Sequence, residues 1–184
     1  MHLLRLLRIF IPLLLVAAIV AGIVVVVTSR SQLQSSRRQV EDAWQPLKSG
    51  LDGLYGALAI ANSSVKSVPG PLHAISTKVS SAEADWQRAE QSGSVTSQVN
   101  AANNLESLGR RLVIAARAAP RLVGQTAALN AIAIYAGLKP PTSAGAFNSA
   151  VAHFENERTR PAKSIAARVL GYESIPTYSV TTAS

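Results

Sequence analysis

Hydrophobic positions follow two patterns along this chain: an unbroken apolar run near its start and a three-and-four alternation after it. From Ile9 to Val27 run nineteen residues without a charge. As a helix they would cover about 28 Å, close to the hydrocarbon thickness of a membrane. The run predicts a transmembrane helix within an anchor over residues 1–29. A cleaved export signal is the alternative, but its apolar core is normally shorter, and Val27-Thr28-Ser29 is a poor cleavage site.

Beyond the anchor, apolar and small residues recur three or four apart, which is the spacing of a helical seam. Its positions in the first stretch are Leu33, Val40, Trp44, Leu47, Leu51, Leu54, Leu58, Ala61, Val65 and Val68. Pro46 should kink this helix or mark its beginning, since an interior proline removes a hydrogen bond. Gly50, Gly53 and Gly56 weaken a helix unless they admit close neighbours, so we expect close helix packing there.

Proline and glycine divide the following residues into further helices. Val68–Pro71 predicts a turn, and Gly93 predicts the end of the second helix. The second seam contains Leu72, Ile75, Val79, Ala82, Trp86 and Ala89. A third pattern begins at Val95 and, with Pro120 as an internal kink, continues to Leu138. The first and second helices, joined by the short turn at residues 68–71, should therefore lie antiparallel.

The last third of the body is expected to hold a loop and two more helices. Residues 139–142 predict the loop, and residues 144–160 predict an amphipathic helix that ends before Pro161. A short helix to Leu170 should follow, ended by Gly171. Residues 173–184 read as an extended, flexible tail.

No stretch alternates with the period of a strand, so the fold class is all-α. We expect an N-terminal transmembrane helix followed by an antiparallel up-and-down helix bundle over residues 30–172. The first soluble helix could continue the membrane helix. Because the core is rich in alanine, Trp44 and Trp86, each able to bury on the order of 200 Å², should contribute disproportionately to it.

Charge and cysteine content narrow the chemistry. Sixteen of the eighteen Lys and Arg and all ten acidic residues follow the anchor, so the body carries about +6. A positive surface favours anionic partners without specifying a fold. The chain has no cysteine, which excludes disulfides and thiolate chemistry. Arginines flank the anchor on both sides, at Arg5 and Arg8 and at Arg30, Arg37 and Arg38, so the positive-inside rule leaves the orientation open.

Catalytic and metal-binding groups are scarce. The body has two histidines, His73 and His153, for which we expect surface or packing roles. Glu157 follows His153 by four residues, but no third metal ligand accompanies them. Glu155 and Glu157 should point to different sides of one helix. No phosphate-binding loop or nucleophile elbow occurs. We therefore expect no catalytic activity, no cofactor and no metal.

Arginines form the one polar cluster with a regular spacing: Arg110, Arg117 and Arg121, with Arg111 beside them. At 100° per residue, the first two lie nearly opposite the apolar seam of their helix, which predicts a basic stripe facing solvent. Such a stripe is either a solvated surface or a site for anionic lipid, because basic side chains gain about 1 kcal/mol each near an anionic leaflet. Nucleic acid is not expected, since no aromatic platform accompanies the arginines.

Three motifs resemble those of the LemA family. VEDAWQPLKSGL, residues 40–51, resembles the family's Val-acidic-acidic-Ala-Trp motif after an amino-terminal membrane helix. RLVIAARAAPRL, residues 111–122, is similar to its apolar stretch ending in Tyr-Pro-x-Leu, with Ala119 in place of the tyrosine before Pro120. Residues 147–172 resemble its closing Tyr-Asn-x-x-Val-x-x-Tyr-Asn helix, with Phe147 and Asn148 at the start.

The resemblance implies a single-pass membrane protein with an antiparallel helical bundle, from a family without an established enzymatic activity. The family's short amino terminus, thought to lie outside, favours a cytoplasmic body. The chain departs from the family at residues 52–62, where DGLYGALAIAN replaces the usual Arg-Arg pair and Leu-Ile-Pro-Asn-Leu run. The role of that segment in this chain stays open.

Two functions fit these features. The first is a membrane-anchored interaction or scaffold module that recruits a protein partner or associates with itself. The alternative is an electrostatic binder of anionic lipid headgroups or acidic ligands through the arginine stripe. A hydrolase is a distant third.

Overall fold

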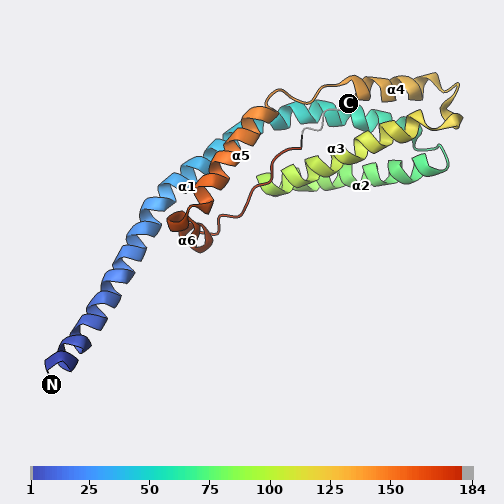
Figure 1. Cartoon of the computed structure of the whole chain (residues 1–184). Helices are drawn as coiled ribbons and strands as arrows, with labels where there is room; N and C mark the ends of the chain where they lie inside the picture. Colours follow the sequence, from blue (N-terminus) through green and yellow to red (C-terminus); the bar gives the residue numbers. More distant parts are fainter. Residues whose placement is uncertain (1, 180–184) are drawn as a thin grey trace. The chain divides into compact units, whose positions relative to one another are not determined.

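The computed structural model describes the backbone of residues 2–179 and the side chains of residues 20, 24, 26–161 and 163–179. Within this part of the chain every regular element is helical and none is a strand, which confirms the all-α prediction (Figure 1). The elements are α1 (His2–Val65), α2 (Pro71–Ser92), α3 (Val95–Arg117), the 3₁₀ turn η1 (Pro120–Leu122), α4 (Thr126–Gly137), α5 (Ala144–Thr159) and α6 (Pro161–Val169).

The chain divides into two compact units. The first unit comprises Met1–Gln39 with Ala152–Ser174, and the second comprises Val40–Val151 with Ile175–Ser184. Each unit therefore joins segments that are far apart in the sequence.

The second unit is bundle-like. Asn62 on α1 donates a hydrogen bond to Ser80 on α2 at 3.0 Å, and Trp44 contacts Trp86 with ring centroids 6.4 Å apart. Rising numbers on α1 thus meet falling numbers on α2, so the two helices are antiparallel. α3 follows α2 after a short turn and runs back along it (Figure 1). The second-unit helices therefore alternate in direction, as the seams predict.

Large aromatic side chains form the centre of the second unit. Trp44 is fully buried and its ring contacts Phe147 at a centroid distance of 5.2 Å. Tyr55 packs edge-on against Trp86 at 5.2 Å. The indole nitrogen of Trp44 donates to the Gln98 side-chain oxygen at 2.6 Å, so its polar atom is satisfied inside the core. Every seam residue from Leu33 to Val68 is buried, which confirms the first periodic pattern.

The turn before α2 and the end of α2 are also confirmed. Residues 66–70 break the helical run where Pro69 and Gly70 predict a turn. Gly93 ends α2 with a φ of 69°, a left-handed conformation that favours glycine, and its amide donates to the carbonyl of Glu90. The α2 seam is buried at five of its six positions, with Ile75 half-buried.

The prediction of one helix running through Pro120 to Leu138 is wrong. α3 ends at Arg117, and Ala119 is extended, with φ −91° and ψ 106°. A residue that precedes proline is pushed out of the helical region by a steric clash. Pro120 then opens the short turn η1, and Gly124 reverses the chain with a φ of 90°. α4 therefore folds back along α3 as a separate helix.

Pro46 and the glycines of α1 behave differently from one another. α1 does not begin at Pro46 but continues through it, and the buried neighbours Trp44 and Leu47 hold the helix on both sides. Gly50 has a close neighbour, but it belongs to a loop and not to a helix: a Cβ there would lie 2.7 Å from the Cβ of Pro141, between α4 and α5. Gly53 and Gly56 face open space, so close helix packing is wrong for these two.

The expectation of a loosely held tail is wrong for residues 175–179. These residues are extended, but Ile175 and Tyr178 are buried in the second unit. Asn148 binds the backbone of Tyr178 twice, donating to its carbonyl at 2.9 Å and accepting from its amide at 2.8 Å. Asn103 binds the neighbouring backbone in the same two ways. Residues 180–184 lie outside the described part.

Small residues form the core of the first unit. Ala166 and Ala167 of α6 pack on Leu33 of α1, with Val26, Leu170 and Tyr172 partly buried around them. Tyr172 also lies edge-on to Phe154 at 6.4 Å and beneath the guanidinium of Arg37 at 5.8 Å. The predicted short helix to Leu170 is thus present as α6, and Gly171 follows it with a φ of 70°.

The predicted membrane anchor falls mainly outside the described side chains. α1 is helical over the charge-free run, but the side chains of residues 9–19, 21–23 and 25 are not described. Among the residues that the structure does describe, no helix is both long and apolar enough to cross a membrane.

Candidate functional site

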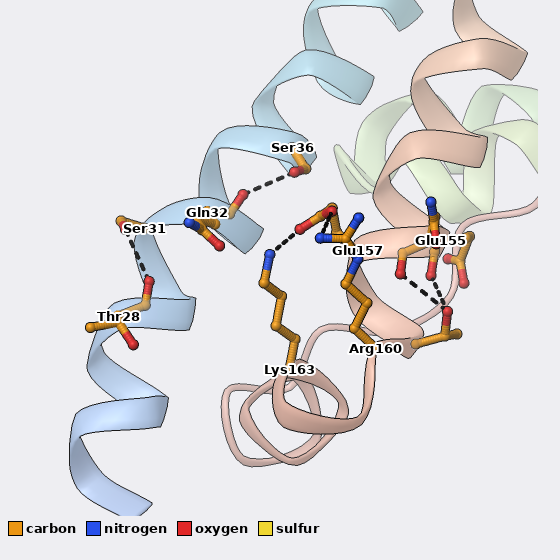
Figure 2. A network of polar contacts seen from close by, with 10 residues as sticks. Thr28, Ser31, Gln32, Ser36, Glu155, Glu157, Arg160 and Lys163 are labelled. Carbon is orange, nitrogen blue, oxygen red and sulfur yellow. Dashed lines mark hydrogen bonds and ion pairs between the residues drawn. The ribbon is translucent and has the colours of Figure 1, made fainter. Parts of the chain in front are cut away.

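A polar cleft in the first unit, lined by an ion cluster, is a candidate site. It has a volume of about 400 Å³ and lies between α1 and the α5–α6 corner (Figure 2). Side-chain amides, hydroxyls and an ion cluster line it: Gln32, Ser35, Ser36, Gln39, His153, Glu157, Arg160 and Lys163. Leu33 of α1 packs against α6, and the polar residues next to it on α1 therefore line the cleft.

Glu157 is the centre of the ion cluster. Its carboxylate is buried and pairs with Arg160, whose Nη1 lies 2.8 Å from Oε1. Lys163 donates to the other carboxylate oxygen (Figure 2). Pro161 begins α6 and turns the chain between the two cations, so that both reach the same acid. One acid thus joins the end of α5 to the first turn of α6.

These contacts determine the charge of the cleft. The hydrogen bond from Lys163 holds the pKa of Glu157 below its usual value, and the charges of Lys163 and Arg160 act in the same direction against the opposing effect of burial. Glu157 is therefore ionised at neutral pH. With two cations on one anion, the cluster keeps a net positive charge, which favours a ligand that carries an anionic or acceptor group.

The polar groups of the cleft are already engaged with one another. The Ser36 hydroxyl donates to the carbonyl of Gln32 at 2.9 Å, so its proton is directed to the backbone (Figure 2). Glu157 is engaged by two cations, Arg160 and Lys163. Among the residues that the structure describes, no group of three or more His, Cys, Asp or Glu lies close enough to hold a metal ion. The arrangement suits hydrogen bonding to a polar ligand.

The two histidines and the paired acids take separate places. His153 is exposed at the cleft, whereas the Nδ1 atom of His73 lies 2.8 Å from the carbonyl of Lys66 at the start of α2. Glu155 pairs with Arg158 at 2.6 Å, apart from Glu157. The two acids therefore serve different cations, as their spacing predicts.

The predicted arginine stripe is not a single exposed face. Arg111, Arg117 and Arg121 are exposed, but Arg110 is half-buried, with Nε 3.4 Å from Oε1 of Glu106. Arg110 differs because it lies in the buried cluster with Glu106, close enough to Tyr135 of α4 and to Tyr178 of the chain end for its charge to act on both. Arg121 belongs to η1 and does not extend α3.

Arg111 instead borders a groove in the second unit. The groove has a volume of about 480 Å³ and an apolar floor flanked by two cations. Its lining consists of Ile75, Lys78, Leu108, Arg111, Ile114, Ala115 and Ala118. It lies along α2 and α3.

A buried polar cluster in the second unit was not predicted. Burial raises the pKa of Glu106 despite its ion pair with Arg110. Burial also raises the pKa values of Tyr55, Tyr135 and Tyr178, which surround it. The Tyr55 hydroxyl donates to the carbonyl of Ala102 at 3.1 Å. Glu106 and Arg110 stand four apart, a spacing that signals an ion pair but not its burial.

The residues expected to be structural are placed as follows. Trp44, Trp86 and Phe147 lie in the aromatic core, Asn148 binds the chain end, and Pro120 opens the turn η1.

Comparisons with known proteins identify no relative. No family model matches the chain, and no curated protein or solved structure matches it. The likeness to the LemA family therefore rests on the three motifs alone.

Proposed function

We propose that the chain is a single-pass protein of the cell membrane whose helical body acts as an interaction module without catalytic activity. On its motifs we take it as a divergent LemA family protein with the body on the cytoplasmic side. The anchor and the interaction face are supported by different residues.

Three valines support the anchor. Val20, Val24 and Val27 are 54%, 54% and 64% exposed and share one face of α1. They lie in the second half of the charge-free run that begins at Ile9. Aliphatic surface left in water costs about 25 cal/mol per Å², whereas lipid tails cover it at no such cost. A bilayer is the surrounding that this row of side chains favours.

The outer face of α4 carries the interaction part of the proposal. α4 contains no charged residue, and its inner positions Ala128, Ile132 and Tyr135 are buried. Ile134 and Leu138, one turn apart, are nevertheless exposed on a different side of the helix. Large aliphatic side chains exposed one turn apart favour a surface that covers them. A protein partner or a second copy of the chain would cover this outer face.

Photocrosslinking in native membranes tests this interaction. A photoreactive residue at Ile134 of the full chain should give one reproducible adduct, whose mass separates a second copy from another protein. The matched control is Ser107, an exposed polar position on α3. Leu138→Asp, one turn from Ile134 and also exposed, should remove the adduct. Equal, diffuse labelling from Ile134 and Ser107 would contradict the proposal.

The alternative function, binding of an anionic lipid or acidic ligand, is favoured by the groove between α2 and α3. Its apolar floor with Lys78 and Arg111 at the side suits a ligand with one apolar and one anionic part. Because that ligand is not a protein, a crosslinker at Ile134 would trap no protein under this alternative.

A further inference from the structure

α6 has two unlike faces. Ala166 and Ala167 are buried against Leu33 of α1. On the other side Ile165 and Val169, one turn apart, are 64% and 69% exposed. Single exposed aliphatic side chains are common, but two at successive turns of one short helix form a continuous apolar surface. Such a surface indicates that something apolar covers it.

The place of α6 along α1 indicates what covers it. Val26, which lies in the last turn of the charge-free run, packs against the same small cluster as α6. Leu33, on which Ala166 and Ala167 of α6 pack, follows Val27 by six residues, or about 9 Å of helix. The polar headgroup layer of a bilayer is roughly 5 to 8 Å thick on each side. The cluster that holds α6 thus extends from Val26, at the end of the hydrocarbon layer, to Leu33, near the outer edge of the headgroups of an anchored α1.

The charges around α6 match that layer. The nine residues of α6 include Lys163 and Arg168 and no acid. Arg168 is exposed beside Val169, and Arg160 is exposed just before the helix. Helices that lie in a membrane interface combine an apolar face with basic residues that meet lipid phosphates.

We propose that α6 is a membrane-interface helix. It lays Ile165 and Val169 into the boundary between headgroups and acyl chains of the anchoring bilayer, while Arg168 contacts the phosphates of anionic lipids. The proposal rests on the proposed anchor, because α1 brings α6 to this depth. It adds a second attachment that holds the first unit against the membrane.

Spin labels on single cysteines test the depth of α6, and the chain offers a clean background because it has no cysteine. The full-length chain is reconstituted in vesicles of phosphatidylcholine with a minor share of phosphatidylglycerol. Labels are placed by Val169→Cys on α6, Val20→Cys in the anchor and Ser107→Cys on α3. Collisions with oxygen, which concentrates in lipid, are compared with those of a water-soluble nickel complex.

The expected result is several-fold lower nickel access at position 169 than at 107, with oxygen access between those of 107 and 20. Lipid exposure at 20 with water exposure at 169 equal to that at 107 overturns the α6 proposal and leaves the anchor standing. Water exposure at 20 overturns the anchor, and the α6 proposal falls with it.

Two further arms separate the apolar contact from the charge. In the Val169→Cys background, Ile165→Ser should raise nickel access at 169 and leave position 20 unchanged. Because Ile165 is exposed, its replacement leaves the packed face of α6 unchanged. An unchanged signal at 169 contradicts apolar insertion. Arg168→Gln, or vesicles without phosphatidylglycerol, should produce a smaller rise. No change in either case overturns the phosphate contact.

Discussion

The two units have different kinds of core. The second unit buries large rings, with Trp86 in contact with both Trp44 and Tyr55. The first unit packs two alanines on Leu33 and adds the ion pairs of Glu157. Since hydrophobic stabilisation follows the apolar area removed from water, the aromatic core contributes more per residue. A small core with exposed apolar neighbours is one that a membrane would complete.

Their buried acids also differ. Burial dominates at Glu106 in the second unit and raises its pKa. Cationic partners dominate at Glu157 in the first unit and lower its pKa. The second unit therefore tolerates a charge inside an apolar core, whereas the first uses a charge to join two helices.

The largest expected effect comes from Trp44→Ala. Removing this fully buried ring leaves a cavity beside Trp86 and Phe147 and an unpaired Gln98, so we expect a loss of about 3 to 5 kcal/mol of unfolding free energy. Urea unfolding of the full chain in detergent micelles, followed by the fluorescence of Trp86, measures it. Ile60→Ala, at an exposed site, should change stability by less than about 0.5 kcal/mol. Similar losses in both variants would refute the aromatic core.

Two glycine substitutions should change the unfolding free energy by smaller amounts and in opposite directions. A Cβ at Gly109 would collide with the Tyr135 hydroxyl and lie 3.2 Å from Leu58, so Gly109→Ala should cost about 1 to 3 kcal/mol. Gly53 faces open space in α1, and Gly53→Ala should stabilise by roughly 0.5 to 1 kcal/mol. Urea midpoints of the two variants measure the difference. If both variants move in the same direction, the packing at Gly109 is misjudged.

The helices and their buried faces were predictable because burial on a helix repeats every 3.6 residues. The effect of each proline was not. Pro46 lies inside α1, where buried neighbours hold the helix, whereas Pro120 follows the extended Ala119 and Gly124 then reverses the chain before α4. Tertiary packing decides between these outcomes. Arg110 was misplaced for the same reason, since it meets Tyr135 and Tyr178 only through segments far along the chain.

The candidate cleft was predictable only in part. Glu157 and Arg160 stand three apart, a spacing that favours an ion pair on one helix. Lys163 lies on the next helix and reaches Glu157 only through the turn at Pro161. The wall from α1 lies more than a hundred residues earlier in the sequence. These contacts between distant segments depend on the packing of α6 on Leu33, and no local sequence pattern predicts that packing.

The smallest effect, and the sharpest contrast between the units, is in pH dependence. The folded pKa of Glu106 lies above its ordinary value of 4.5, so its share of stability is complete below pH 4.5 and is lost as pH rises through the folded pKa. The folded pKa of Glu157 lies below 4.5, so its share is present above pH 4.5 and is lost as pH falls through the folded pKa. The two units therefore respond to pH in opposite directions.

Hydrogen exchange read by mass spectrometry separates the two responses, because peptides from α3 report the second unit and peptides from α6 report the first. Dividing each variant's rate by the wild-type rate at the same pH removes the intrinsic pH dependence of exchange. Glu106→Gln should increase the protection of α3 relative to wild type as pH rises above 4.5, and leave α6 unchanged. Glu157→Gln should reduce the protection of α6 above pH 4.5, with a difference that shrinks as the medium is acidified. Equal changes in α3 and α6 for either variant would mean that one cooperative core, and not two differently built units, sets the stability of the body.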